Sequence, residues 1–186
     1  SAEGWPATDL TGDKMKLRLV GMFAALVCGF LADGHAAGPR IGTYDSRAIA
    51  IAYAGSPAQQ KVMAPLRDAL KKATQENNQP EVARLNALGR AMQDTAHRQA
   101  FSTAPVDDLL LHIADSLPRI RRDAGVEALV SKWDAAGLAV HAGAERVDVT
   151  DAMVDAFMPT ERQRKVVEEI RRKPPLPLDE VRAGRQ

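Results

Sequence analysis

The chain between residues 57 and 85 reads PAQQKVMAPLRDALKKATQENNQPEVARL, and this stretch decides the fold class. It is dominated by Ala, Leu, Lys, Arg, Glu and Gln, which are strong helix formers. Ser56 followed by Pro57 is typical of a helix start, because Ser is a good N-cap and Pro fits the first helical position. Asn77 to Pro80 predicts a turn, after which Pro80 starts a second helix. The stretch therefore predicts consecutive helices.

Helical composition continues beyond this stretch to about Gly125, where the glycine predicts a helix end. A second break is predicted at Ser102 to Pro105. Pro65 and Pro118 lie inside the helical patterns and are expected to kink their helices. After the second break, apolar residues with three–four spacing predict one helix: Val106, Leu109, Leu110, Ile113, Leu117, Ile120 and Ala124. We therefore predict an interrupted, coiled-coil-like helical arm over residues 57–125.

Strand candidates lie on both sides of this arm. Residues 40–54 (RIGTYDSRAIAIAYA) open with a strand candidate, although their Ala-rich second half also fits a helix. Residues 126–133 (VEALVSKW) and 145–149 (ERVDV) are further strand candidates, with a turn at Gly137 and the apolar Leu138 to Val140 between them. The order predicts an α+β fold in which a small antiparallel sheet of three or four strands carries the protruding helical arm.

Two short helices and a tail are predicted after the last strand. Thr150 or Asp151 is expected to cap a helix that ends near Phe157. Pro159 and Thr160 start a final amphipathic helix. Residues 174–186 form a Pro-rich tail.

The N-terminal region has the pattern of a secretory signal peptide over residues 15–36. Lys16 and Arg18 precede an uncharged apolar run at 19–31, and small residues follow up to Ala36. The run is shorter than the about 20 residues that span a bilayer, and a retained anchor is the competing interpretation. Residues 1–14 lack periodicity and are interpreted as a non-native or mis-started leader, which leaves a single α+β domain at 37–173.

The single cysteine, Cys28, lies in the segment that signal cleavage would remove. The remaining chain would then form no disulfide. An exported domain without disulfides favours a bacterial periplasm over a disulfide-rich secreted module.

Composition argues against a nucleic-acid partner. The formal net charge is +1 at pH 7, and aromatic residues make up 4% of the chain, too few for a base-stacking platform. Two short basic clusters remain, at Arg119 to Arg122 and at Arg171 to Lys173. They indicate either peripheral contact with anionic membrane or an acidic partner, or ordinary cations near helix C-termini.

No residue cluster predicts a catalytic, cofactor-binding or metal site. His97, His112 and His141 lack the spacing of a metal pair on one helical turn, although His97 and His112 would meet if their helices packed together. No G-x-S-x-G elbow and no Gly-rich phosphate loop occurs.

Carboxylates at the predicted strand ends admit two interpretations. Asp45 with Ser46, and Asp148 with Asp151, would form a metal or acid–base site if the strands paired. The other interpretation is structural, with Thr150 and Asp151 as helix N-cap residues. Asp107 and Asp108 complement the dipole of the following helix. Trp133 is interpreted either as a partner anchor or as the cap of a small core.

Three segments resemble the Skp/OmpH-like periplasmic chaperone family. Residues 40–46 (RIGTYDS) are similar to its opening strand, and residues 124–130 (AGVEALV) to its helix end, glycine and returning strand. Residues 147–154 (VDVTDAMV) are similar to its closing segment. The resemblance implies a holdase-like chaperone that binds unfolded envelope or outer-membrane proteins without chemistry or cofactors. It also implies a homo-oligomer, a trimer in this family, assembled through the sheet positions Ile41, Val130, Val147 and Val149.

The sequence departs from this family in two respects. The family has a long two-helix arm, whereas this chain carries two turn signals. Those chaperones are often strongly basic, whereas this chain is nearly neutral. The apolar stripe at 106–124 fits either the inside of a hairpin or a contact between subunits.

Two other classes of function stay open. One is an exported hydrolase or metal-dependent enzyme that uses Asp45, His112 or Asp148. The other is an envelope adaptor whose Pro-rich tail docks a partner.

Overall fold

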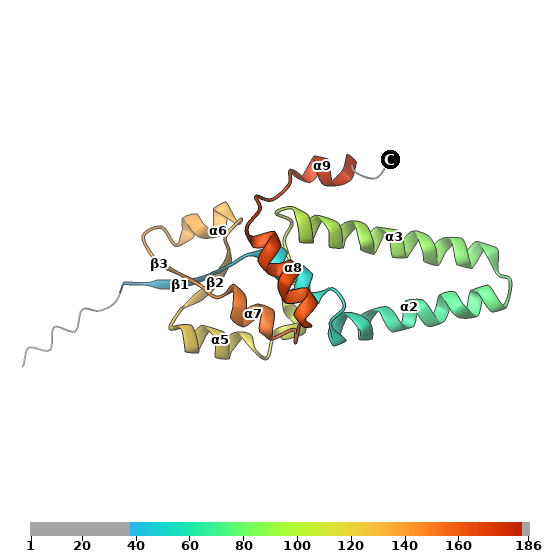
Figure 1. Ribbon diagram of the computed structural model, residues 1–186, viewed down its shortest axis with the longest axis horizontal. Coiled ribbons are helices and arrows are strands. Elements are labelled where there is room, and N and C mark those ends of the chain that lie inside the picture. Colours follow the sequence, from blue (N-terminus) through green and yellow to red (C-terminus); the bar gives the residue numbers. More distant parts are fainter. Residues whose placement is uncertain (1–37, 184–186) are drawn as a thin grey trace, which may run out of the picture. The chain divides into compact units, whose positions relative to one another are not determined.

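The computed structural model describes residues 38–183 (Figure 1). The leader predicted at 1–14 and the signal peptide predicted at 15–36 lie outside the described residues. The elements follow in the order β1 (Arg40–Tyr44), α1 (Ser46–Tyr53), α2 (Pro57–Gln75), α3 (Gln79–Phe101), α4 (Asp107–Leu110), the 3₁₀ helix η1 (Leu111–Ile113), α5 (Leu117–Ala124), β2 (Ala128–Ser131), α6 (Ala135–Val140), β3 (Glu145–Asp148), α7 (Thr150–Asp155), α8 (Glu161–Arg171) and α9 (Leu178–Ala183).

The three described strands form a parallel sheet in the order β2-β1-β3. Thr43 of β1 lies opposite Val130 of β2 and Asp148 of β3, and both pairings are parallel. The prediction of an antiparallel sheet is therefore wrong. The physical reason is that helices separate the strands: α1 to α5 lie between β1 and β2, and α6 lies between β2 and β3. Such crossovers bring consecutive strands back in the same direction.

Helices α2 and α3 form a hairpin and lie side by side (Figure 1). Ser56 caps α2 as predicted, since its side chain accepts a hydrogen bond from the Gln59 backbone. At the tip, Asn77 has a φ of 54°, a left-handed conformation that Asn tolerates better than most residues. Asn78 then caps α3. The first predicted turn is thus the tip of the hairpin, and the second, at Ser102 to Pro105, follows its end.

The segment predicted as one helix from Val106 to Ala124 is instead divided into α4, η1 and α5. Pro118 lies in the first turn of α5, where its missing N–H costs nothing, so the prediction that it kinks a helix interior is wrong. Gly125 ends α5 with a φ of 63°, as its position in the sequence predicts.

Helix α1 lies at the centre of the core. Ala48, Ile49 and Ala52 are fully buried, and α1 contacts α3, α7 and α8. Its position resolves the ambiguity over residues 46–53 in favour of helix. Ile41, Val130 and Val149 are also buried within this chain, and Val147 packs against the same core. The first three side chains therefore pack inside the chain, whereas Val147 is only partly buried.

The C-terminal part departs from its predicted caps. Thr150 is the first residue of α7 rather than its N-cap, which is Val149. Instead, the Thr150 hydroxyl accepts a hydrogen bond from the Asp45 backbone. The short segment from Leu138 to Val140 belongs to α6.

Helix α8 begins as predicted, with Thr160 and Gln163 forming a capping box. The Pro-rich stretch after it leads to α9, which contacts α3, and the Leu176 amide donates to the Phe101 carbonyl. Within residues 38–183, none of the helices has the length and apolar composition needed to cross a membrane.

Candidate functional site

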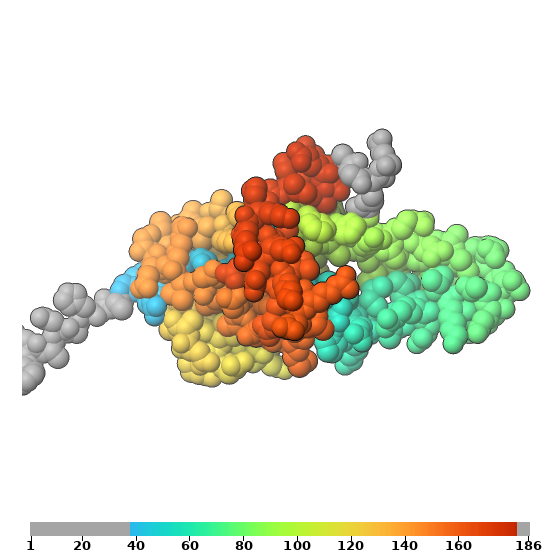
Figure 2. All heavy atoms as spheres, viewed as in Figure 1, coloured from blue at the N-terminus to red at the C-terminus, as the bar shows by residue number. Residues whose placement is uncertain are grey.

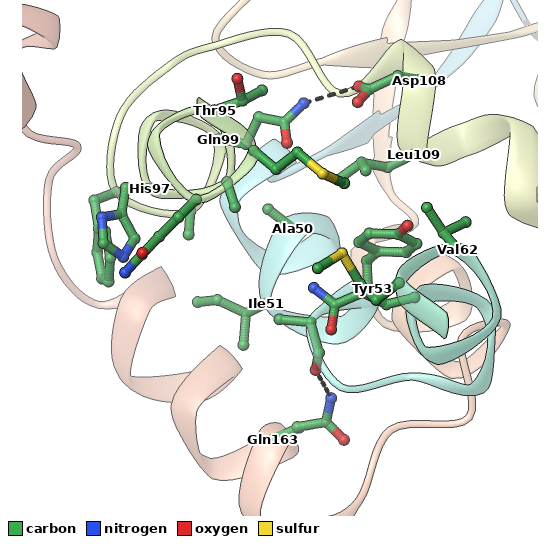
Figure 3. Close-up of a pocket in the computed structure, with 18 of the residues that line it drawn as sticks. Ala50, Ile51, Tyr53, Val62, Thr95, His97, Gln99, Asp108, Leu109 and Gln163 are labelled. Carbon is green, nitrogen blue, oxygen red and sulfur yellow. Dashed lines mark hydrogen bonds between the residues drawn. The ribbon is translucent and has the colours of Figure 1, made fainter. Parts of the chain in front are cut away.

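A cavity of about 840 Å³ lies at the base of the helical hairpin (Figure 3). We call it the arm-base cavity. Residues of α1, α2, α3, α4, η1 and α8 line it, and in Figure 2 the orange-red atoms of α8 lie beside the teal start of α2. Its volume falls within the about 300–1,000 Å³ range of ligand pockets. Its large apolar side chains are Ile51, Val62, Met63, Met92, Phe101, Leu109 and Val166.

Small residues on α1 and α3 explain why space is left open there. They are Ala50, Ala54, Gly89, Ala96 and Ala100, all of which line the cavity. A Cβ added at Gly89 would have its nearest neighbour at 4.0 Å, the Leu66 Cδ2 atom. Larger side chains at these positions would fill the cavity, so the sequence keeps a pocket where helices would otherwise pack closely.

One side of the arm-base cavity is polar. The Gln99 side chain donates to the Asp108 carboxylate at 2.8 Å and to the Pro105 carbonyl at 3.0 Å. The Tyr53 ring stacks on His112, with centroids 5.0 Å apart and an interplanar angle of 17°. Burial, with a smaller contribution from the Asp108 charge, raises the pKa of Tyr53. These groups place hydrogen-bonding capacity beside an otherwise apolar wall.

The opposite side is formed by α8 (Figure 3). The Gln163 amide donates to the carbonyls of Ala52 and Ala54, which joins α8 to the end of α1. Arg162 lines the same wall. The cavity therefore has an apolar middle and polar groups on two sides, a distribution that suits binding of apolar groups.

The histidines within residues 38–183 do not belong to a group of side chains that could hold a metal ion. His97 and His112 both line the arm-base cavity, but His97 lies beside Phe101 and His112 stacks on Tyr53. Nothing among residues 38–183 brings together three or more His, Cys, Asp or Glu side chains in an arrangement that could hold a metal ion.

Asp45 lies in a buried ion-pair network at the end of β1. Its carboxylate accepts from the Arg47 guanidinium at 2.9 and 3.1 Å, from the Trp133 indole at 3.0 Å and from Lys132 Nζ at 2.7 Å. Burial favours the protonated acid, but the hydrogen bonds from Arg47, Lys132 and Trp133 outweigh it and lower the pKa of Asp45 to about 2. Asp45 is thus a structural anion rather than a proton-transfer group at neutral pH.

Asp148 also has structural partners. Its carboxylate accepts from the Thr150 amide at 2.9 Å and pairs with Arg171 at 2.9 Å. Burial opposes ionisation, but the Thr150 hydrogen bonds and the nearby Arg171 and Lys132 charges lower the pKa of Asp148. Within the described part of the chain, no hydrogen bond joins His112 to Asp45 or Asp148, so the three residues of the enzyme hypothesis do not form one constellation.

The basic cluster at Arg171 to Lys173 is engaged within the chain. Arg171 pairs with both Asp148 and Asp151, and Arg172 lies 3.8 Å from Glu168. The Lys173 carbonyl accepts from Arg47 at 2.9 Å. The helix-end interpretation therefore accounts for the two arginines without a lipid.

Trp133 connects the ends of β1 and β2, a role that no local sequence pattern indicates. Its ring lies 5.0 Å from both the Arg47 and the Lys132 cations, and its indole N–H donates to Asp45. The close spacing of Asp45 and Arg47 is the only part of this ion-pair network that is visible in the sequence. Lys132 and Trp133 are too distant from them in sequence for any local pattern to connect them.

The chain was compared with protein-family models, with curated proteins and with solved structures, and none of the three comparisons gives a match. The similarity of three short segments to OmpH-like chaperones therefore stays a prediction.

Proposed function

We propose that this protein is a non-catalytic binding protein that holds apolar segments of unfolded polypeptides in the arm-base cavity. The observation that carries the proposal is an apolar cavity of about 840 Å³ at the base of a helical hairpin. The function is that of a holdase: apolar client surface is removed from water, which slows aggregation and requires no nucleotide.

The lining suits varied clients. Met63 and Met92 lie on opposite helices of the hairpin, and methionine side chains adapt to differently shaped partners. Burying one Leu, Ile or Phe side chain contributes about 1.5–3 kcal/mol. Two or three such side chains would supply roughly 3–9 kcal/mol before the costs of association and ordering, which fits weak, reversible capture.

The export and assembly of the protein are part of the same proposal. The signal-like segment and the resemblance to OmpH-like chaperones support a periplasmic homo-oligomer of trimer size that binds envelope proteins. Because Ile41, Val130 and Val149 are buried within the chain, assembly would use other surfaces, such as the exposed edge of β3. Light scattering of the purified protein tests this, and a monomer mass would contradict it.

The binding proposal is tested by aggregation of an unfolded β-barrel protein diluted from denaturant. Val62→Asp and Val166→Asp each place a charge in the cavity at a side chain that is 41% exposed, so the fold should tolerate both changes. Leu88→Asp is the matched control, since Leu88 is 45% exposed on the same hairpin but does not line the cavity.

We expect the wild type and Leu88→Asp to suppress aggregation and the two cavity variants to lose most of this effect. Thermal unfolding of each variant verifies that it is folded. Equal suppression by all four proteins, or none by the wild type, would contradict the proposal.

A further inference from the structure

A second cavity of about 500 Å³ lies at the carboxyl ends of β1 and β2. We call it the strand-end cavity. Tyr44 and Ser131, the last residues of the two strands, line it, and it shares no lining residue with the arm-base cavity. The crevice outside the carboxyl ends of parallel strands is where open α/β sheets commonly bind ligands.

Two carboxylates give the strand-end cavity its charge. Asp107 is in the first turn of α4, and Asp134 caps α6 by accepting from the Gly137 amide at 2.9 Å. Neither carboxylate forms an ion pair with any residue in the range 38–183. The cap made by Asp134 and the first-turn position of Asp107 explain why acidic residues occur here, but neither gives its carboxylate a cationic partner.

Tyr44 supplies an independent sign of a ligand. The residue is only 5% exposed, and the part that stays open lines the cavity, where its side chain forms no hydrogen bond with another described residue. A phenol hydroxyl can both donate and accept a hydrogen bond, so this open edge of an otherwise buried residue is available to a ligand in the cavity. Burial, with additional effects of Asp107 and Asp134, raises the pKa of Tyr44 to about 12, so the hydroxyl stays protonated near both carboxylates.

The neighbouring cations do not reverse the negative charge. Arg47 and Lys132 lie over the Trp133 ring, and Asp45 binds both of them. Together with Asp107 and Asp134, the group contains three carboxylates and two cations. The walls of the cavity add apolar surface from Pro105, Trp133 and Val140, and Val140 is 80% exposed.

We propose that the strand-end cavity binds a small organic ammonium ion, a protonated primary amine on a short apolar body. The ammonium group donates hydrogen bonds to Asp107, Asp134 and the Tyr44 hydroxyl oxygen. The apolar body lies against Trp133 and covers Val140. This activity is separate from client binding, since it uses a different cavity.

The test is calorimetric titration of the full chain with 2-phenylethylammonium at pH 7 and low ionic strength. The neutral analogue 2-phenylethanol has the same apolar body without the charge. We expect the ammonium ion to bind at least tenfold more tightly, because charge-assisted hydrogen bonds are stronger than neutral ones. Equal binding of the two compounds, or no binding of the ammonium ion, would overturn the proposal.

Variants locate the binding site. Asp107→Asn and Tyr44→Phe should each weaken ammonium binding about five- to tenfold. Asp108→Asn is the matched control on the same helix, since Asp108 lines the other cavity, and its affinity should stay within about twofold of the wild type. Equal effects of Asp107→Asn and Asp108→Asn would refute the assignment. Asp107 is exposed, so Asp107→Asn should fold and keeps the test decisive even if Tyr44→Phe does not fold.

A final titration distinguishes a free amine from a lysine side chain. The probe is N-acetyl-lysine methylamide, which carries the same ammonium group on a peptide unit. We expect it to bind more weakly than 2-phenylethylammonium. Tighter binding would overturn the assignment to a free amine.

Discussion

Replacing Asp45 by Asn should destabilise this protein more than most single substitutions. The Asp45 and Arg47 side chains are 0% and 1% exposed, and Asp45 also accepts from Lys132 and Trp133. The Asn side chain keeps the size but removes the charge, which leaves the Arg47 guanidinium buried without its counterion. Removing one partner of a buried ion pair costs about 3–5 kcal/mol.

The pH dependence gives a second, independent magnitude. Folding lowers the pKa of Asp45 from 3.8 to about 2, which corresponds to roughly 2.5 kcal/mol of stabilisation by the ionised form. Because the pKa is lower in the folded state, this stabilisation is fully present above pH 4 to 5 and is lost as the pH falls towards 2. Integrating the linkage between pH 5 and pH 2 gives a loss of about 2 kcal/mol.

The assay is urea unfolding of the wild type and Asp45→Asn at pH values from 7 to 2. We expect a difference in unfolding free energy of at least 3 kcal/mol at pH 7 that shrinks by about 2 kcal/mol at pH 2. The control is Asp155→Asn, which removes the half-exposed ion pair with Arg164 and should cost less than about 1 kcal/mol. A difference for Asp45→Asn that is below 1 kcal/mol, or that does not change with pH, would refute this account of the network.

Two further substitutions test close packing and capping by urea unfolding. Gly42→Ala should lower the unfolding free energy by about 1–3 kcal/mol, because the new Cβ would lie 2.7 Å from Leu129 Cδ2. Gly38→Ala is the control and should have no effect, because a Cβ there has no neighbour within 4 Å. Similar effects of the two substitutions would argue against tight packing at β1. Thr160→Ala should lower the unfolding free energy by about 1 kcal/mol, because it removes the hydroxyl that accepts a hydrogen bond from the backbone N–H of Gln163 in the capping box. Thr74→Ala should cost less, since the Thr74 hydroxyl only donates to the Leu70 carbonyl within its own helix, and an equal loss would show that the capping box contributes nothing specific.

Signals that act within a few residues were predictable. The starts of α2 and α8 and the end of α5 follow from Ser56, Thr160 and Gly125, because a cap bonds to backbone one turn away. The prediction that Thr150 caps α7 was wrong because a contact distant in sequence involves its hydroxyl. Its hydroxyl accepts from Asp45, a residue from the other end of the folded chain, and this tertiary contact competed with the local one.

The candidate sites were not predictable from local patterns. Asp45 and Arg47 are neighbours, but Lys132 and Trp133 reach them only because β1 and β2 pair in parallel. The arm-base cavity depends on small residues of α1 and α3 meeting α8, and the strand-end cavity on α4 and α6 meeting at the ends of two strands. Such clusters combine residues whose sequence separation carries no information about their distance.

The sequence by itself determined where α2 and α8 begin and where α5 ends, that a turn near Asn78 reverses the chain, and that a few short strands accompany a long helical region. Helix propensity and capping are local properties, because each depends on residues within about one helical turn of one another in the sequence. Only the tertiary structure decided the direction of the strands and the location of the two cavities. Strands of the same composition pair in either direction, and the helical crossovers between β1, β2 and β3 make the parallel arrangement the one that closes the core.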